Sequence, residues 1–410
     1  MQWVKEGKLI SVKSWCGELE DKAMDQAMNL AAHSKLFKHV ALMPDAHCGY
    51  GMPIGGVIAC KDAVIPNAVG VDIGCGMGAV KTSLKVDDFP DMRSIRELLN
   101  EVKKDVPLGK NRHQNKQSWE GFDCYLASRK LTRETLANCG LGWLSKGSFE
   151  VAEKSLGSLG GGNHFIELQA DEDGDIWLML HSGSRNLGYK IAEYYHELAL
   201  GINKANGDEL PDEELAFLST DSEEGQGYIR DMSFALEFAY ENRQRMMAVF
   251  KEALQKFFPE VEFLKEVNIH HNYAGLETHF GEEVWVHRKG ATSAKAGEWG
   301  IIPGSMGTSS YIVKGKGNPE SFMSCSHGAG RKMSRTAACK KLTPEACDEA
   351  MEGIVFDRWR KIHGRRWQKT KGLDLGEAPQ AYKDIDEVIE SELDLITPVV
   401  KLRPLGVIKG

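Results

Sequence analysis

The sequence of 410 residues has no excess of positive charge, no long apolar run and no internal repeat. Its formal net charge of −8 argues against binding nucleic acid through bulk electrostatics, so such a partner would need a local basic groove. No apolar stretch reaches the length of a membrane span, and the first residues lack the apolar core of a signal peptide. We therefore expect a cytoplasmic protein with no membrane contact.

The cysteines also do not follow the patterns of a disulfide scaffold or of a structural zinc site. The nine cysteines are an odd number spread along a long chain, which is typical of a reducing compartment. No second cysteine lies two to four residues from Cys75, so the spacing of a structural zinc site is absent there. The thiols are therefore predicted to be free for metal binding or for chemistry.

Residues 69–77 place an oxygen donor and a sulfur donor among glycines. Asp72 and Cys75 are three residues apart, and a thiolate can bridge two cations while the glycines let the backbone approach a metal ion or a phosphate. Their partners must come from distant small-residue loops, where we find His164, His181 and His271. A buried small hydrophobic residue is the alternative for a lone cysteine, but the neighbouring Asp72 favours a site for two metal ions.

The apolar periodicity predicts an α+β fold. We expect strands at residues 39–43, 165–168, 176–180, 284–286 and 397–408, and helices at residues 18–32, 92–103, 228–257 and 382–395. Adjacent histidines in an extended segment point to opposite faces, so only one of His270 and His271 should enter a site. Because the candidate ligands span most of the chain, we expect one compact domain over residues 1–410, with a dinuclear metal cleft.

Other glycine-rich loops carry candidates for chemistry. His327 precedes a glycine turn that ends at Arg331; a histidine can attack phosphorus, and an arginine can neutralise phosphoryl oxygens. A metal ligand or a hydrogen-bonded turn residue are the alternatives for His327. Residues 301–307 could present backbone N–H groups to an anion. Asp45 and His47 are further candidates, with a turn capped by the aspartate as the alternative.

The most basic window of the chain is residues 358–371, which contains two tryptophans and no acidic residue. Basic side chains can neutralise phosphates and aromatic rings can stack on bases, so this window is a candidate nucleic-acid contact. A surface for a partner protein is the alternative. If the window binds RNA, reversing Arg365 and Arg366 to Glu should weaken RNA binding, and unchanged binding would contradict the assignment.

Taken together and in order, the motifs at Asp72, Cys75, His164, His181, His271 and His327 resemble those of the RtcB family of RNA-splicing ligases. The resemblance covers nearly the whole chain, since residues 43–47, 303–307, 381–386 and 409–410 also match. It implies a GTP- and Mn²⁺-dependent ligase that joins an RNA end with a 2′,3′-cyclic phosphate or 3′-phosphate to a 5′-hydroxyl end. An archease-like activating protein is a further partner that the resemblance implies.

The resemblance also assigns roles. Cys75 would bridge two Mn²⁺ ions, with Asp72 and His164 completing one site and His181 and His271 the other. His327 would attack the α-phosphate of GTP and form a covalent histidine–GMP adduct, which passes GMP to the RNA 3′-phosphate. Arg331 and Asp45 are the other implied catalytic residues. The implied cofactor-binding residues are Asn163, Glu167, Pro303, Gly304, Ser305, Met306, Tyr382 and Lys409, with Glu167 and Lys409 reading the guanine edge and Tyr382 stacking on it.

Two other functions stay open. A metal-dependent phosphoesterase acting on RNA ends could use the same dinuclear site without joining anything. A catalytically silent RNA-binding protein is the third reading, and the intact ligand set speaks against it. The donor types alone would favour zinc over manganese, because cysteine and histidine sites bind zinc more tightly. The choice of Mn²⁺ therefore depends on the resemblance.

Overall fold

The protein folds around two β-sheets whose strands come from the whole length of the chain. The computed structural model describes residues 1–361 and 372–410. The strands are β1 (Trp3–Lys5), β2 (Ser11–Ser14), β3 (His39–His47), β4 (Ile54–Cys60), β5 (Ala63–Val64), β6 (Gly76–Lys85), β7 (Phe165–Asp171), β8 (Asp175–Ser182), β9 (Leu218–Ser219), β10 (Phe263–His270), β11 (Asn272–His279), β12 (Glu282–Lys289), β13 (Ala291–Ser293), β14 (Trp299–Ile302), β15 (Ser310–Gly315), β16 (Ser324–Ser326), β17 (Val355–Phe356) and β18 (Ile396–Lys409).

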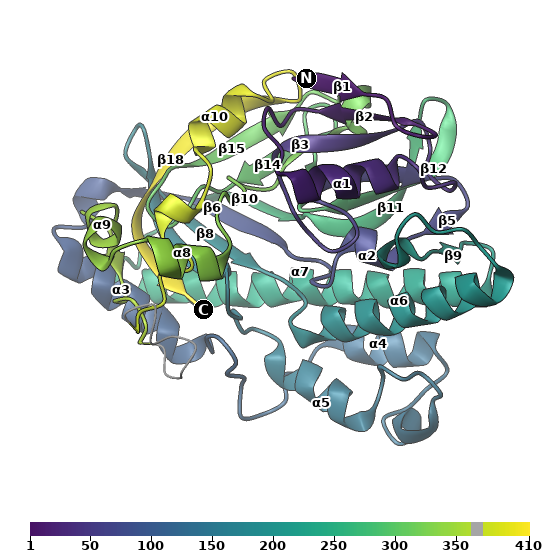
Figure 1. Cartoon of the computed structure of the whole chain (residues 1–410). Coiled ribbons are helices and arrows are strands. Elements are labelled where there is room, and N and C mark those ends of the chain that lie inside the picture. The colour runs from purple at the N-terminus through teal and green to yellow at the C-terminus, as the bar shows by residue number, and fades with distance from the viewer. Residues whose placement is uncertain (362–371) are drawn as a thin grey trace.

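The helices surround these sheets (Figure 1). They are α1 (Asp21–Leu30), α2 (Pro66–Val69), α3 (Met92–Asp105), α4 (Glu120–Ser128), α5 (Lys146–Ser155), α6 (Asn186–Asn206), α7 (Glu223–Phe257), α8 (Arg335–Lys341), α9 (Pro344–Glu349) and α10 (Ile385–Glu390). In Figure 1, α1 and α10 lie in the upper part of the view, whereas α6 and α7 lie side by side beneath the sheets, with α4 and α5 below them. Within the described residues, no helix combines the length and the apolar character needed to cross a membrane.

The two sheets differ in order. The six-stranded sheet runs β1-β2-β3-β4-β12-β11, and the larger sheet runs β10-β6-β8-β7-β18-β15-β14 with β17 added beside β18. The central strands β7 and β8 are almost continuously buried, as expected for strands covered on both faces. The mixture of sheets and separate helices confirms the predicted α+β fold.

Helix α7 is the longest helix and joins two parts of the core. Ser222 caps its first turn by accepting a hydrogen bond from the backbone N–H of Gly225, and acidic residues in that turn complement the helix dipole. Met232 and Phe238 pack in a cluster with α4, α5 and α6, whereas Met246 and Phe250 pack against β7, β8 and α3. The predicted helix at residues 228–257 and its apolar face are therefore confirmed.

Two local predictions differ from the structure. The helix expected at residues 382–395 spans only Ile385–Glu390, because Asp384 caps its start and Glu392 turns inward, where it accepts a hydrogen bond from the N–H of Ser326. The alternative that Asp45 caps a turn is wrong. Strand β3 continues through Asp45 to His47, with an irregular register that leaves the Asp45 side chain fully buried.

Candidate functional site: a metal cluster beside a nucleophilic histidine

One edge of the larger sheet gathers four of the expected metal ligands. Cys75 immediately precedes β6 and His164 precedes β7, whereas His181 ends β8 and His271 follows β10. Strand β6 is antiparallel to both β8 and β10, and β7 is antiparallel to β8, so the beginnings of two strands lie beside the ends of two others. Antiparallel pairing therefore brings these side chains together although they are far apart in sequence.

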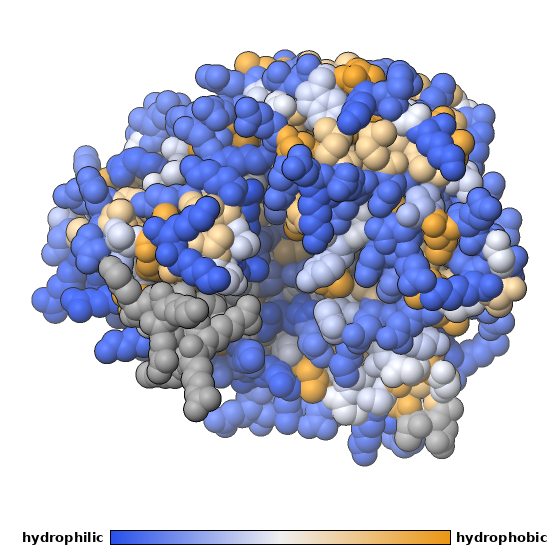
Figure 2. Space-filling view, viewed as in Figure 1, coloured by the Kyte–Doolittle hydropathy of each residue, from blue (hydrophilic) through white to orange (hydrophobic). Residues whose placement is uncertain are grey.

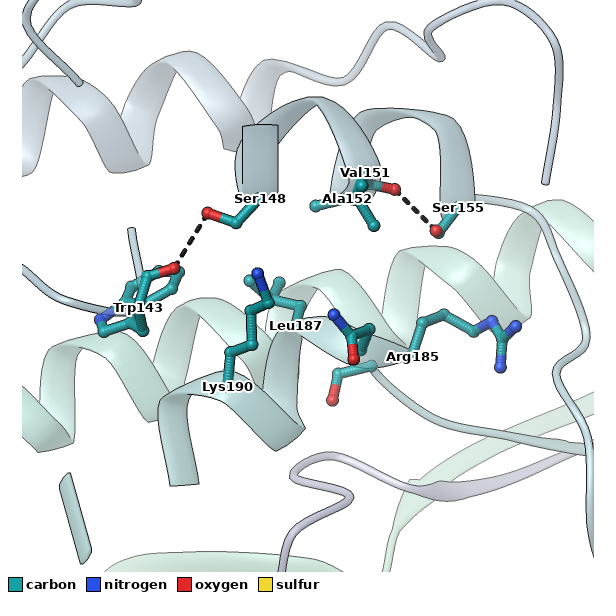
Figure 3. A pocket seen from close by; sticks show the side chains of 10 residues that line it. Trp143, Ser148, Val151, Ala152, Ser155, Arg185, Leu187 and Lys190 are labelled. Atoms are coloured by element: carbon teal, nitrogen blue, oxygen red, sulfur yellow. Dashed lines mark hydrogen bonds between the residues drawn. The ribbon is translucent and has the colours of Figure 1, made fainter. Parts of the chain in front are cut away.

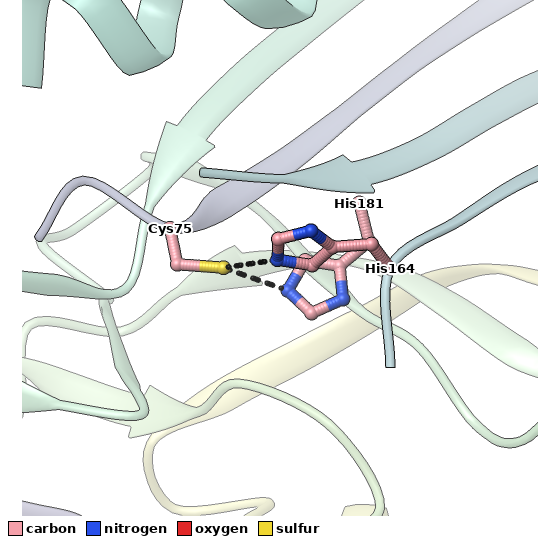
Figure 4. A group of neighbouring side chains, drawn as sticks. All are labelled: Cys75, His164 and His181. Atoms are coloured by element: carbon pink, nitrogen blue, oxygen red, sulfur yellow. Dashed lines mark hydrogen bonds between the residues drawn. The ribbon is translucent and has the colours of Figure 1, made fainter. Parts of the chain in front are cut away.

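The donor atoms of these residues lie within contact distance. Cys75 Sγ is 3.4 Å from His164 Nε2 and 3.1 Å from His181 Nε2. Figure 4 shows both imidazole rings next to the sulfur. Asp72 Oδ2 is 3.2 Å from His164 Nε2, and His271 Nε2 is 3.3 Å from His181 Nε2. Cys75, His164 and His181 form a buried group that could hold a metal ion. A continuous series of side-chain contacts thus runs from Asp72 through His164, Cys75 and His181 to His271.

The protonation of this cluster suits metal binding. His164 Nδ1 lies 2.9 Å from the carbonyl of Leu159, and His181 Nδ1 lies 3.4 Å from that of Asn163, which leaves both Nε2 atoms with free lone pairs. Burial lowers the pKa of His181 and His271 well below the ordinary value, so both are neutral. Burial, together with Asp72, raises the pKa of the Cys75 thiol well above its ordinary value, so metal binding must displace a proton.

An unpartnered buried atom supports the same assignment. Within the described residues, Asp72 Oδ1 is buried without a hydrogen-bond partner, and such an atom is costly unless something binds it. The facing Nε2 atoms of His181 and His271 would be two acceptors 3.3 Å apart, a contact that a cation between them would relieve. The residues present therefore fit divalent metal ions, although sulfur and imidazole donors do not select manganese over zinc.

His327 lies next to the cluster of candidate metal ligands. Its ring centroid is 4.9 Å from that of His271, and Gly290, with φ of 60°, leaves room for it where a Cβ would come within 3.0 Å of Cε1. Asp45 Oδ2 lies 2.6 Å from His327 Nδ1, an ion-pair distance at an angle outside hydrogen-bonding geometry, and 3.3 Å from the His327 backbone N–H. The fully buried Asp45 thus faces Nδ1 and leaves Nε2 as the outward nitrogen.

A network of charged side chains lines the cleft near the C-terminus. Arg331 donates to Tyr382 Oη at 3.1 Å and to Glu377 Oε1 at 3.2 Å, while Glu377 also pairs with Arg335 and lies 3.5 Å from Lys409 Nζ. Burial alone would raise the pKa of Glu377, but Lys409, Arg335 and Arg331 outweigh it and lower the pKa to about 2. Because the donors of Arg331 are taken up by protein acceptors, its contact with a phosphoryl oxygen stays a prediction.

The other expected cofactor residues surround this network. Lys409 Nζ donates to the carbonyl of Asn163, and Pro303, Gly304, Ser305 and Met306 line the same cleft. Glu167 lies deeper: it is only 2% exposed, accepts a hydrogen bond from Gln169 at 2.7 Å and does not line the cleft wall. Burial raises the pKa of Glu167 to about 7, against the opposing influence of Lys409.

All these groups except Glu167, Glu377 and Asp45 border one cleft of about 880 Å³. Figure 2 shows that this face of the molecule is hollowed near its centre, with mostly hydrophilic residues around the opening. Six lining residues are basic (Lys22, Lys289, Arg331, Lys332, Arg335 and Lys409) and two are acidic (Glu20 and Asp72). The cleft is therefore a local basic groove on a protein whose net charge is −8.

A second cavity lies between α5 and α6, where Figure 3 shows its lining side chains. Its volume is about 10 Å³, which is room for about one water molecule. The serine hydroxyls on its wall are already bonded, Ser148 to the carbonyl of Trp143 and Ser155 to that of Val151. This cavity is too small and too well satisfied to be a substrate site.

Sequence reasoning did not assign two basic residues of the cleft or the buried glutamate behind it. Glu377 and Arg335 belong to no motif, and Lys289, though adjacent to a glycine, gave no separate signal; a buried cation can be recognised only from its environment. The proposed nucleic-acid contact at 358–371 falls mostly on residues 362–371, which lie outside the described part of the chain. The described Arg360 donates to the carbonyl of Lys409, at the edge of the cleft.

Comparison with known proteins identifies the class to which this fold and site belong. Residues 26–410 match the family described as tRNA-splicing ligase RtcB, and the chain belongs to this family. It is 40% identical to the RNA-splicing ligase RtcB of Escherichia coli K12, with 97% of each chain covered. It is 33% identical to the tRNA-splicing ligase RtcB of Nanoarchaeum equitans (99% and 97% covered) and 32% identical to that of Thermococcus kodakarensis (95% and 92% covered).

Proposed function

We propose that this protein is a GTP- and Mn²⁺-dependent RNA ligase that joins a 3′-phosphate or 2′,3′-cyclic phosphate end to a 5′-hydroxyl end. The observation that carries the proposal is His327, an imidazole directed by a buried carboxylate and placed against a metal cluster in a basic cleft. Its support from relatives is that they are named RNA- or tRNA-splicing ligases. We propose that residues 1–410 act as one unit, because the site draws on residues from Asp45 to Lys409.

In this proposal His327 is the nucleophile. The carboxylate of Asp45 faces Nδ1, and its charge favours the tautomer with the proton on that nitrogen, so the lone pair of Nε2 is free to attack the α-phosphate of GTP. The bond from phosphorus to the bridging oxygen breaks, pyrophosphate leaves, and GMP stays on His327. An oxygen of the RNA 3′-phosphate then attacks the same phosphorus and frees the histidine. Finally the 5′-hydroxyl attacks the 3′-phosphate, forms the phosphodiester bond and releases GMP.

The metal ions would be held by the five residues at the sheet edge, with Cys75 between them, Asp72 and His164 on one side and His181 and His271 on the other. When bound, such ions stabilise the charge that develops on phosphoryl oxygens. The protein's own contribution is to fix the donors: the carbonyls of Leu159 and Asn163 orient two of the rings. A cyclic phosphate end would first be opened by water to the 3′-phosphate.

We assign the guanylate to the end of the cleft that contains Asn163, Ser305, Tyr382 and Lys409. Lys409 and the Glu377 network give this end a fixed, charged wall, and Tyr382 offers a ring for stacking. Glu167 is close enough to Lys409 to influence the electrostatic field at that end of the cleft. Because Glu167 is buried, the guanylate could contact it only by passing the side chains that line the cleft.

We assign the RNA 5′-hydroxyl strand to the group formed by Tyr50, Asn67 and Lys289. Tyr50 is 70% exposed on the cleft, and its backbone carbonyl is held by Lys289 Nζ, which also donates to the carbonyl of Asn67 at 2.9 Å. An exposed ring on an anchored backbone suits stacking on a base. Lys289 is 6% exposed, and burial lowers its pKa to about 7. Its carbonyl partners carry no net charge, so a nearby phosphate group would stabilise the charged form of Lys289.

All nine cysteines are free thiols, which fits the proposed cytoplasmic location. An archease-like activator stays an expectation from the family. The second candidate function is an RNA-end phosphoesterase, because the same metal cluster could hydrolyse a cyclic phosphate.

The test that separates these functions uses two short RNAs, one with a 2′,3′-cyclic phosphate and one with a labelled 5′-hydroxyl end, incubated with the protein, Mn²⁺ and GTP. A ligase yields a longer labelled product only when GTP is present. Opening of the cyclic phosphate to a terminal phosphomonoester without joining, equal with and without GTP, would favour the phosphoesterase. Cys75→Ser serves as the control in which either activity should disappear.

A further inference from the structure

Two consecutive residues of α7 bind groups next to Cys75, His181 and His271 and, through one intervening hydroxyl, the carbonyl that orients His164. Asn242 and Arg243 are 0% and 1% exposed, and α7 itself contributes no proposed metal ligand. Neither residue has a role in the proposed steps from GTP to the joined RNA. Their polar groups must therefore be explained by what they bind inside the protein.

The guanidinium of Arg243 contacts three segments: the residues just before β6, the end of β8 and the end of β10. Nη1 donates to the carbonyl of Gly74, next to Cys75, at 2.8 Å and to that of Ser182, next to His181, at 3.0 Å. Nη2 lies 3.1 Å from His270 Nδ1, next to His271, and Nε donates to Asn268 Oδ1 at 2.7 Å. One side chain thus binds residues that flank three proposed metal ligands, at the start of β6 and at the ends of β8 and β10.

Asn242 makes the connection to the fourth ligand. Its Oδ1 accepts hydrogen bonds from the N–H groups of Gly157 and Ser158 at 2.7 and 3.1 Å, and Nδ2 donates to the Ser182 hydroxyl at 3.2 Å. That hydroxyl donates to the carbonyl of Leu159 at 2.7 Å, the same carbonyl that orients the ring of His164. The loop before His164 is therefore tied to the strand end that carries His181.

Asp72 and Cys75 favour the charge of Arg243, but attraction to metal ions cannot explain a buried cation at this place. A guanidinium beside a site for divalent cations repels them, and its hydrogen-bond partners in the described chain are neutral. Burial lowers the pKa of Arg243 to about 10, so it stays charged at neutral pH. The guanidinium has a planar fork of donors, which a lysine lacks, and this fork can bind the acceptors next to all three ligands at once. The sequence also leaves space for it: at Gly76 a Cβ would lie 3.0 Å from Arg243 Cζ.

We propose that Arg243 is a positioning residue that holds Cys75, His181 and His271 at the spacing that two metal ions require, with Asn242 holding His164 to the same frame. The inference rests on the proposed metal site. Loss of an outer partner of metal ligands typically costs 10- to 100-fold in metal affinity, and we expect a loss of about that size when the fork is removed.

The test compares Arg243→Lys and Arg243→Met with the wild type and with Arg230→Ala, which removes an exposed guanidinium from the same helix. Mn²⁺ affinity is measured by the electron paramagnetic resonance signal of free Mn²⁺, and thermal unfolding of the metal-free proteins is followed by circular dichroism. Arg243→Lys keeps the charge and loses the fork, so we expect about 10- to 100-fold weaker Mn²⁺ binding by a folded protein. Arg230→Ala should bind like the wild type.

Three outcomes would overturn the proposal. Mn²⁺ affinity of folded Arg243→Lys within twofold of wild type would show that the fork is not needed, even if the metal-free protein melts at a lower temperature. Tighter binding by Arg243→Met would show that repulsion, not geometry, dominates. Equal weakening by Arg230→Ala would show a nonspecific effect. If Arg243→Met does not fold, Arg243→Lys decides; if the wild type binds Mn²⁺ without accepting GMP, the GTP chemistry fails while this comparison still applies.

Discussion

Glu167 is a carboxyl group whose burial should make the protein less stable at neutral pH than it would be with an amide in its place. Its side chain is 2% exposed, and burial raises its pKa from 4.5 to about 7 despite Lys409. In the unfolded chain the group loses its proton near pH 4.5, whereas in the folded protein it keeps the proton until about pH 7. Stability from the protonated form is therefore complete below pH 4.5 and is lost as the pH rises to 7.

The size of the effect follows from the two pKa values. At about 1.4 kcal/mol per pH unit, the interval from 4.5 to about 7 corresponds to about 3 kcal/mol. Glu167→Gln keeps the shape and removes the titration. Relative to wild type, we expect it to raise the free energy of unfolding by about 3 kcal/mol at pH 8 and by less than about 1 kcal/mol at pH 5.

The assay is urea unfolding of both proteins from pH 5 to pH 8 without metal or GTP. Gln169→Glu would be a poor control because it adds a charge, so Glu6→Gln, an exposed carboxyl, serves instead. A difference between Glu167→Gln and wild type that does not grow with pH would refute the burial argument. The same variant should accept GMP more slowly if Glu167 reads the guanine edge, so stability and activity should change in opposite directions.

Two further variants test other parts of the site. Tyr50→Ala should reduce RNA joining by about 5- to 150-fold, the value of about 1–3 kcal/mol for one stacked base, while guanylylation stays at the wild-type rate and Tyr50→Phe behaves like wild type; equal loss in both assays would place Tyr50 elsewhere. Asp45→Asn should slow guanylylation by about 10²- to 10⁴-fold, because an amide cannot hold the proton on His327 Nδ1 as the carboxylate does; a rate within threefold of wild type, in single-turnover measurements, would contradict this role.

The sequence located the five residues that the structure brings together better than the groups that hold them. Asp72, Cys75, His164 and His181 stand next to glycines and other small residues, where polar residues have few structural reasons to occur. Glu377 has no such setting, since its three cationic partners, Arg331, Arg335 and Lys409, come from two segments that are remote from it in sequence. Asn242 and Arg243 lie in a helix whose periodic apolar residues indicate core, and their polarity alone does not show that they face a site.

Fold prediction shows the same division between local and long-range information. Periodicity located α7 and β18 because each is long and strongly patterned. The order of strands in the sheets, which brings Cys75 beside His181 and His271, depends on pairings between distant segments that periodicity does not encode. Helix 382–395 was predicted too long because the inward turn at Glu392 depends on a partner, Ser326, that is remote in sequence.

The most direct test of the central claim is transfer of label from GTP carrying a radioactive α-phosphate to the protein, read on a denaturing gel. Wild type with Mn²⁺ should become labelled, and His327→Ala should not, although it keeps all five proposed metal ligands. Omitting Mn²⁺ should also abolish the label. Equal labelling of His327→Ala would contradict the assignment of the nucleophile, and no labelling of wild type with bound Mn²⁺ would contradict the ligase mechanism.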